Sequence, residues 1–334
     1  LNGGLLVPGF IDVHVNGGAG ELLNHKPSAK ALKTIAKAHR EYGTTAFLPT
    51  LITDTWEQMV NAVAAVAAAV ELGVPGILGI HLEGPYPNEE RKGVHPAKRI
   101  RVPTSHEDLN HLFDVFPAHL IKLMTLAPEQ VSPAFIRRLT QDGMIVSAGH
   151  TEASYDQMQT ALAHGVTGFT HLFNAMSPMT SREPGVVGAA LDHADSWCGL
   201  IVDGHHVHPV TLRQAIKAKA KGKMILVTDA MHTVGQGAGR FDLMGSPIVS
   251  ANGKVTTLDG TLAGSDLDMA SAVRNTVQQV GLELEEALRM ASLYPAQFLK
   301  LDHKIGRIAK GFQADLVLID DHMQVQQTWI KGEI

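Results

Sequence analysis

Short apolar runs that alternate with longer amphipathic stretches constrain the fold of this chain more than any other feature. Eight runs resemble strands, and several are almost continuously apolar, as is typical of strands buried on both faces. Six stretches between them repeat their apolar residues with the helical period. The predicted strands cover residues 7–15, 44–51, 76–82, 121–126, 144–148, 168–173, 199–203 and 223–228, and the predicted helices cover 29–42, 55–72, 133–141, 155–164, 209–220 and 266–280.

This alternation predicts a parallel α/β fold, because strands that follow one another through helices pair in parallel. Eight such strands favour a (β/α)8 TIM-like barrel. A doubly wound sheet is the alternative architecture. No Gly-x-Gly-x-x-Gly motif follows the first predicted strand, which weakens a dinucleotide-binding interpretation.

Two segments do not belong to the eight predicted barrel strands or to the helices between them. Residues 241–257 predict an inserted hairpin, with Asn252-Gly253 as its turn. Residues 314–319 and 324–330 predict two short strands, and two strands alone are only marginally stable.

We therefore expect two domains. Residues 1–302 would form the (β/α)8 barrel domain, and residues 303–334 would supply the C-terminal strands of a small β-sandwich domain. The sequence begins at Leu1 without an initiating Met. We expect that an N-terminal segment is missing and that its strands would pair with the two C-terminal strands.

The composition excludes several classes of protein. With 45% hydrophobic and 18% charged residues the chain is globular rather than disordered. A net charge of −5 gives no basic field for nucleic acid or an anionic membrane, and no apolar run reaches the roughly 20 residues of a membrane span. The single cysteine, Cys198, excludes a disulfide framework and multi-cysteine metal sites. The 18 histidines, against 4 tyrosines, point to metal or acid–base chemistry.

Polar side chains follow six of the eight predicted strands. In a barrel of this type the active-site groups lie at the C-terminal ends of the strands. Buried charges are costly unless they are paired or bound to metal, so we expect these groups to form one site. They are Asp12 and His14, His81 and Glu83, His150, His171 and Asn174, Asp203 with His205 and His206, and Asp229.

Glu83, His150 and His171 together offer one carboxylate and two imidazoles. This is the ligand set of a catalytic zinc site that keeps an open position for water, although iron, cobalt, nickel or manganese are chemically acceptable. Asp229 adds a carboxylate that could act as general base. We expect one divalent metal ion, with zinc as the first choice.

Recognisable motifs occur along nearly the whole chain. They include Pro-Gly-Phe-Ile-Asp at 8–12, His-Leu-Glu-Gly-Pro at 81–85, Ser-Ala-Gly-His at 147–150, His-Leu-Phe-Asn-Ala-Met at 171–176 and Leu-Val-Thr-Asp-Ala at 226–230. In this order they resemble the amidohydrolase superfamily of metal-dependent barrels, and within it the chain is most similar to the N-acetylglucosamine-6-phosphate deacetylases. Pro-Gly-Phe-Ile-Asp alone marks only the superfamily, whereas His-Leu-Glu-Gly-Pro and His-Leu-Phe-Asn-Ala-Met together are much more specific to these deacetylases.

The resemblance implies hydrolysis of the acetamide of N-acetyl-D-glucosamine 6-phosphate to glucosamine 6-phosphate and acetate. It implies a cytoplasmic enzyme, usually a homodimer, whose partner is this small substrate. It places the metal on Glu83, His150 and His171, and the acid/base on Asp229. It places substrate contacts on Val94, His95, Asn174, Ala175, Arg182, His206, Leu262, Ala263 and Gly264.

The residues can perform each step that amide hydrolysis needs. A metal lowers the pKa of bound water to about 7 and polarises the carbonyl. Asp229 would take the proton and return it to the departing nitrogen. His95 or His206 would donate to the developing oxyanion, and Arg182 would bind the phosphate through two parallel hydrogen bonds.

One position departs from the superfamily pattern. Barrels of this type often carry His-x-His after the first strand, whereas this chain has His14-Val15-Asn16. Asparagine is a poor transition-metal ligand. We predict one essential metal, while His14 leaves room for a weak second site that would share Glu83 and Asp229.

Three alternatives stay open. An N-acetylgalactosamine-6-phosphate deacetylase would use the same machinery and differ only near the sugar 4-hydroxyl, for which residues 89–92 and 233–239 are candidates. A cyclic-amide hydrolase of the same superfamily would lack a phosphate cradle. A catalytically inactive sugar-phosphate sensor would not need a base such as Asp229 beside a metal.

Overall fold

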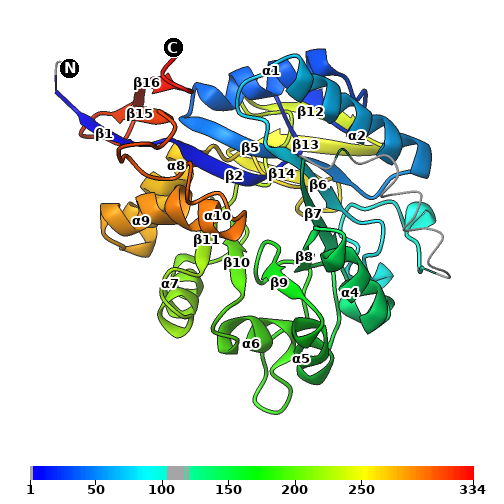
Figure 1. The fold of residues 1–334 in the computed structure, drawn as a ribbon. Helices are drawn as coiled ribbons and strands as arrows, with labels where there is room; N and C mark the ends of the chain where they lie inside the picture. The colour runs from blue at the N-terminus through cyan, green and yellow to red at the C-terminus, as the bar shows by residue number, and fades with distance from the viewer. Residues whose placement is uncertain (1–2, 104–116, 118–119) are drawn as a thin grey trace.

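Eight parallel strands form a closed barrel, which confirms the predicted fold class. The computed structural model describes residues 3–103, 117 and 120–334. A parallel bridge between Val15 and Ala230 joins the first strand to the segment after the last one and closes the barrel (Figure 1). In spatial order the strands are β11 (Met224–Leu226), β10 (Trp197–Leu200), β9 (Val166–Phe169), β8 (Ile145–Ala148), β7 (Ile121–Leu126), β6 (Gly79–Glu83), β5 (Thr44–Ile52) and β2 (Phe10–Val15).

Helices surround the strands on the outside of the barrel (Figure 1). Several begin at a hydroxyl side chain that accepts a backbone N–H, as Ser28, Thr55, Ser132 and Ser154 do. No helix of the described residues is long and apolar enough to cross a membrane. The helices are α1 (Ala29–Arg40), α2 (Trp56–Glu71), α4 (Pro133–Gln141), α5 (Tyr155–Ala163), α6 (Gly185–Asp192), α7 (Pro209–Ala218), α8 (Met269–Asn275), α9 (Leu284–Ala291) and α10 (Leu293–Phe298).

Several predicted bounds were wrong. The strand predicted at 168–173 ends at Phe169, because His171 and Phe173 have positive φ angles that break an extended strand. The helix predicted at 266–280 begins at Met269 and continues from Thr276 as one π-helical turn. Helices α6, α9 and α10 were not predicted. In α6, Gly185–Ala190 is buried on every side, so it lacks an amphipathic pattern.

The insertion predicted as a hairpin has three strands. They are β12 (Gly239–Leu243), β13 (Ser246–Ala251) and β14 (Lys254–Thr257), in that spatial order. The predicted Asn252-Gly253 turn is confirmed between β13 and β14, with φ angles of 55° and 73°. We call these three strands the meander.

A second small sheet unites the two ends of the chain. The predicted first strand, 7–15, is two strands, and its first part, β1 (Leu5–Pro8), pairs with β15 (Leu316–Ile319) rather than with the barrel. β15 in turn pairs with β16 (Val325–Trp329), and Figure 1 shows both termini beside this sheet. β1 therefore supplies the pairing that we expected from strands of a missing N-terminal segment. The division into domains 1–302 and 303–334 stays a prediction.

A small apolar cluster lies between the meander and the barrel. Leu243, Ile248 and Val255 of the meander pack there with residues of the barrel loops. This cluster is separate from the main core, which lies between the strands and their helices. The other buried members of the cluster are Leu22, Ile52, Met231 and Ala263.

Candidate metal and active site

Some of the predicted strand-end residues line one cavity of about 470 Å³, namely Glu83, His150, His171, Asn174, His206 and Asp229. The others, Asp12, His14, His81, Asp203 and His205, do not line it. Glu83 is the last residue of β6, and His150, His171 and Asp229 lie just beyond β8, β9 and β11. Loops and the meander complete the wall. The lining consists of Asn16, Leu22, Asn24, Ile52, Glu83, Glu90, Arg91, Gly93, Val94, His95, His150, His171, Asn174, Ala175, His206, Asp229, Met231, Leu243 and the segment 260–264.

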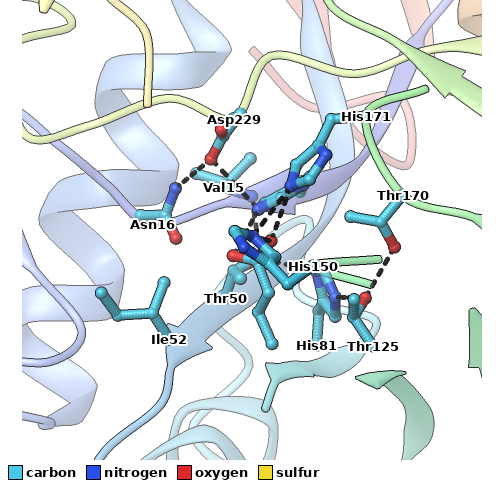
Figure 2. Close-up of polar contacts among 12 residues, drawn as sticks. Val15, Asn16, Thr50, Ile52, His81, Thr125, His150, Thr170, His171 and Asp229 are labelled. Carbon is cyan, nitrogen blue, oxygen red and sulfur yellow. Dashed lines mark hydrogen bonds and ion pairs between the residues drawn. The ribbon is translucent and has the colours of Figure 1, made fainter. Parts of the chain in front are cut away.

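The three predicted metal ligands converge on one point. Glu83 Oε1 lies 3.2 Å from His150 Nε2 and 3.1 Å from His171 Nε2. The two Nε2 atoms are themselves 3.1 Å apart. All three side chains are buried, and Figure 2 shows the two imidazoles turned toward each other. Within the described chain they form a group whose ligand atoms all lie within 4.8 Å of one another.

The hydrogen bond between His150 and the Arg91 carbonyl shows that these atoms suit a cation. His150 Nδ1 donates to the Arg91 carbonyl at 2.8 Å, and a carbonyl oxygen can only accept. A neutral His150 therefore presents an unprotonated Nε2 to Glu83 Oε1, another acceptor. Burial lowers the pKa of His171, which favours the neutral form of that imidazole. The lone pairs of His150 Nε2 and Glu83 Oε1 repel one another, whereas a divalent cation bound by Glu83, His150 and His171 would turn this repulsion into coordination.

A second group shares Glu83. His14 Nε2 lies 3.1 Å from Glu83 Oε2 and 3.1 Å from Asp229 Oδ1, and the Asn16 amide donates to Asp229 Oδ1 at 2.6 Å. Burial opposes protonation of His14, but the two carboxylates raise its pKa well above the ordinary value. Burial would likewise raise the pKa of Asp229, but His14 holds that pKa below its usual range, so Asp229 is ionised.

Three of these residues have left-handed backbones. The φ angles are 51° at His150, 35° at His171 and 53° at Asp229, a region that non-glycine residues seldom occupy. Each residue lies two or three residues beyond the end of a strand, so the unusual φ turns the chain sharply at the mouth of the barrel. Such strain is typical of functional sites.

His95 is buried beside the metal ligands rather than exposed on a loop. Its Nδ1 accepts from the Thr53 backbone N–H at 3.4 Å and lies 2.8 Å from the Thr53 hydroxyl. An N–H can only donate, so the proton of a neutral His95 is on Nε2, which lies 3.9 Å from Glu83 Oε2. Burial lowers the pKa of His95 to about 3. His95 is therefore a neutral hydrogen-bond donor at the cavity.

Asp203 orients His206. Its Oδ2 accepts from His206 Nδ1 at 2.6 Å, while its Oδ1 accepts from the backbone N–H groups of His205 and His206. Burial opposes ionisation, but these hydrogen bonds keep the pKa of Asp203 below its usual value. His206 lines the cavity, whereas its neighbour His205 is exposed. The carboxylate thus determines which nitrogen of His206 carries a proton.

The remaining predicted substrate contacts divide into two groups. Val94, Asn174, Ala175 and the backbone of 262–264 line the cavity. Arg182 is exposed on the loop between β9 and α6 and does not line it. Its predicted role in phosphate binding stays a prediction.

Sequence reasoning missed some residues that shape the site and the role of another. Asp203 was expected at the site, but its role in orienting His206 was not predicted, although the three-residue spacing was a detectable signal. Thr53 and Asn24 carried no comparable signal. The apolar wall formed by Leu22, Ile52, Met231 and Leu243 depends on where the meander folds. Of the two segments proposed to distinguish epimers, 89–92 reaches the cavity through Glu90 and Arg91, whereas no residue of 233–239 lines it.

Comparison with known proteins agrees with this geometry. The sequence matches the amidohydrolase family over residues 5–334. The chain belongs to the amidohydrolase family. The resemblance seen in its motifs is thereby confirmed.

Relatives of this amidohydrolase include deacetylases of both sugar epimers. It is 45% identical over 334 residues to N-acetylgalactosamine-6-phosphate deacetylase of Shewanella sp. (strain ANA-3), covering 100% of this chain and 84% of the relative. The crystal structure of N-acetylglucosamine-6-phosphate deacetylase from Pasteurella multocida superposes with a TM-score of 0.95 at 39% identity, covering 99% and 86% of the two chains. A mutant of the Mycobacterium smegmatis enzyme, solved in complex with N-acetyl-D-glucosamine-6-phosphate, superposes with a TM-score of 0.93 at 33% identity, covering 98% and 86%.

Proposed function

We propose that this protein hydrolyses the acetamide of an N-acetylhexosamine 6-phosphate to acetate and the amino-sugar phosphate. The observation that carries the proposal is the convergence of Glu83, His150 and His171 with Asp229 and His95 on one cavity. Amidohydrolases with 33–45% identity that cover nearly the whole chain are deacetylases of this substrate class.

Glu83, His150 and His171 would hold the metal ion, for which we propose zinc. When bound, such an ion supplies Lewis acidity toward the amide carbonyl and lowers the pKa of water. The ligand set of two imidazoles and a carboxylate is that of catalytic zinc sites.

Asp229 would move the proton. The hydrogen bonds from Asn16 and His14 both reach Oδ1, so Oδ2 is the oxygen that takes the proton from the attacking water. Asp229 then delivers this proton to the departing nitrogen, which lets the amine leave in neutral form. Asn16 therefore orients the base instead of binding metal.

His95 would stabilise the oxyanion that forms on the amide carbonyl. Its Nε2–H is the free donor of a neutral ring that Thr53 holds in place. A donor placed in advance where negative charge develops is worth more in a buried site than in water. His206, oriented by Asp203, would bind the sugar phosphate together with Asn174 and Ala175.

The sugar epimer is the finer part of the proposal. The motif resemblance predicts the gluco substrate, whereas the 45% identity to an N-acetylgalactosamine-6-phosphate deacetylase favours the galacto substrate. Both need the same machinery around the acetamide. Glu90 and Arg91 line the cavity and are candidates for the contact that distinguishes the 4-hydroxyl. The cyclic-amide hydrolase remains the alternative. Asn174→Ala, which shortens a side chain proposed to bind the phosphate, tests it, because only a sugar phosphate would show a large rise in KM.

The test is acetate release from both N-acetylhexosamine 6-phosphates by zinc-loaded protein, with Asp229→Asn as the control. We expect turnover of at least one epimer, with kcat reduced by at least about 100-fold in the variant, the scale of general acid–base catalysis. The ratio of the two kcat/KM values assigns the epimer. Folded, zinc-loaded protein that releases no acetate from either sugar would overturn the proposal.

A further inference from the structure

A row of polar side chains crosses the barrel interior beneath the metal ligands. The Val15 N–H donates to Thr50 Oγ1 at 3.0 Å, and Thr50 Oγ1 lies 3.2 Å from His81 Nδ1. His81 Nε2 is 2.7 Å from Thr125 Oγ1, which is 2.7 Å from Thr170 Oγ1 (Figure 2). We call Thr50, His81, Thr125 and Thr170 the cross-barrel chain. All four are buried.

Three positions along this row lie beside a candidate metal ligand. Val15, held by Thr50, follows His14. His81 lies two residues before Glu83, so both side chains lie on the same face of β6. Thr170 directly precedes His171.

The segment that carries His150 contacts the cross-barrel chain through packing. Gly149 precedes His150, and a Cβ placed on Gly149 would lie 2.7 Å from Thr125 Cγ2 and 3.0 Å from Thr170 Cβ. The backbone before His150 therefore rests directly on the Thr125–Thr170 pair. The cross-barrel chain supports the segments that carry His14, Glu83, His150 and His171.

The need to fill volume inside the barrel does not explain why these four residues are polar. Layers inside such barrels are dominated by Val, Ile and Leu, which fill the same volume without polar atoms. Thr44, at the start of β5, is a useful contrast, because its buried hydroxyl has no hydrogen-bond partner among the described residues. Hydrogen bonds, unlike apolar contacts, fix direction as well as distance. The cross-barrel chain therefore sets how the strand ends are aligned.

We propose that the cross-barrel chain is the positioning scaffold of the metal site, with Thr125 as its central link. Its members contact neither substrate nor metal and act by holding the ligand-bearing strand ends in register. This inference rests on the metal site of the proposed function. It predicts that removing one hydroxyl, with no change of volume, weakens metal binding.

The test compares Thr125→Val, Thr125→Ser and Thr44→Val with the unaltered protein. Zinc affinity is measured by competition with a chromophoric chelator, and thermal unfolding of the metal-free proteins is recorded beside it. We expect Thr125→Val to bind zinc about tenfold more weakly, the lower end of losses seen when groups that support metal ligands are removed. Thr125→Ser keeps the hydroxyl and should restore the affinity. Thr44→Val should leave it unchanged.

The outcomes separate this inference from the proposed function. Unaltered protein that binds no zinc would overturn the proposed function and this inference with it. Zinc binding by Thr125→Val that equals that of the unaltered protein would overturn this inference alone, even if the melting temperature falls. Equal losses in Thr125→Val and Thr125→Ser would show that keeping the hydroxyl does not restore zinc binding, and would also overturn this inference. If Thr125→Val lacks a native melting transition, Thr170→Val removes the last link and gives the same comparison.

Discussion

At the scale of single residues, the chemistry of the site depends on atoms one hydrogen bond away from it. The Arg91 carbonyl determines which nitrogen of His150 is free to bind a cation. In the same way, Thr53 determines which nitrogen of His95 carries the proton, and Asp203 determines it for His206. A neutral imidazole has one donor and one acceptor, so the partner on one nitrogen decides what the other can do.

The Asp203→Asn variant tests this dependence. The amide cannot replace both carboxylate oxygens as acceptors for His206, and a hydrogen bond to a charged group is worth about 1.5–3 kcal/mol. We expect kcat/KM to fall about 10- to 100-fold with little change in melting temperature. Steady-state kinetics would show this, with Asp321→Asn in the exposed turn after β15 as the control. An unchanged kcat/KM would mean that His206 needs no orientation.

At the scale of elements, Glu129 fastens the loop that carries Arg91. Glu129 Oε1 accepts from the Asn88 amide at 2.9 Å and from the Glu152 N–H at 2.7 Å. Its Oε2 accepts from the Thr151 hydroxyl. These bonds tie the loop after β6 to the ends of β7 and β8, where His150 lies.

We predict that Glu129→Gln loosens this loop. A carboxamide has one acceptor oxygen for three donors, so at least one of them loses its partner, which costs about 1–3 kcal/mol. Trypsin cleavage after Arg91, followed by mass spectrometry, should be faster than in the unaltered protein. Glu71→Gln, at the exposed end of α2, is the matched control. Equal cleavage rates in both variants would show that Glu129 does not hold the loop.

At the scale of the whole molecule, the sheet of β1, β15 and β16 fastens both ends of the chain to the barrel. Arg40 at the end of α1 donates to the carbonyls of Glu333 and Thr328 at 2.7 and 3.3 Å. The Thr328 hydroxyl donates back to the Arg40 carbonyl at 2.9 Å. β16 covers the edge of β15 that β1 leaves free.

Removal of residues 321–334 should therefore destabilise the molecule. It deletes β16, exposes the edge of β15 and removes the contacts to Arg40, and an uncovered strand edge promotes aggregation. We expect a lower melting temperature and aggregates on size-exclusion chromatography. A chain that lacks only the exposed Ile334 is the control. If the shortened chain melts like the control and elutes with it, β16 does not protect the molecule.

Much of the architecture was predictable because it depends on local pattern. Most barrel strands are buried apolar runs, and such a run is recognisable without knowing its neighbours. The exception is β9, whose short Val-Thr-Gly-Phe sequence includes an exposed Thr167. Helix α6 was missed because its apolar residues surround it completely. The division of residues 7–15 between β1 and β2 was missed because it depends on a distant partner. β1 pairs with β15, which lies more than 300 residues away in the sequence.

The sequence by itself determined the fold class and the candidate ligands Glu83, His150 and His171, because parallel strands bring their C-terminal ends to one face of a barrel. The tertiary structure alone decided how these groups are held. Asn16 and Asp229 lie 213 residues apart in sequence yet share a hydrogen bond, and Arg182 lies outside the cavity despite its motif. Protonation and orientation depend on contacts between distant segments, and these contacts exist only once the barrel closes.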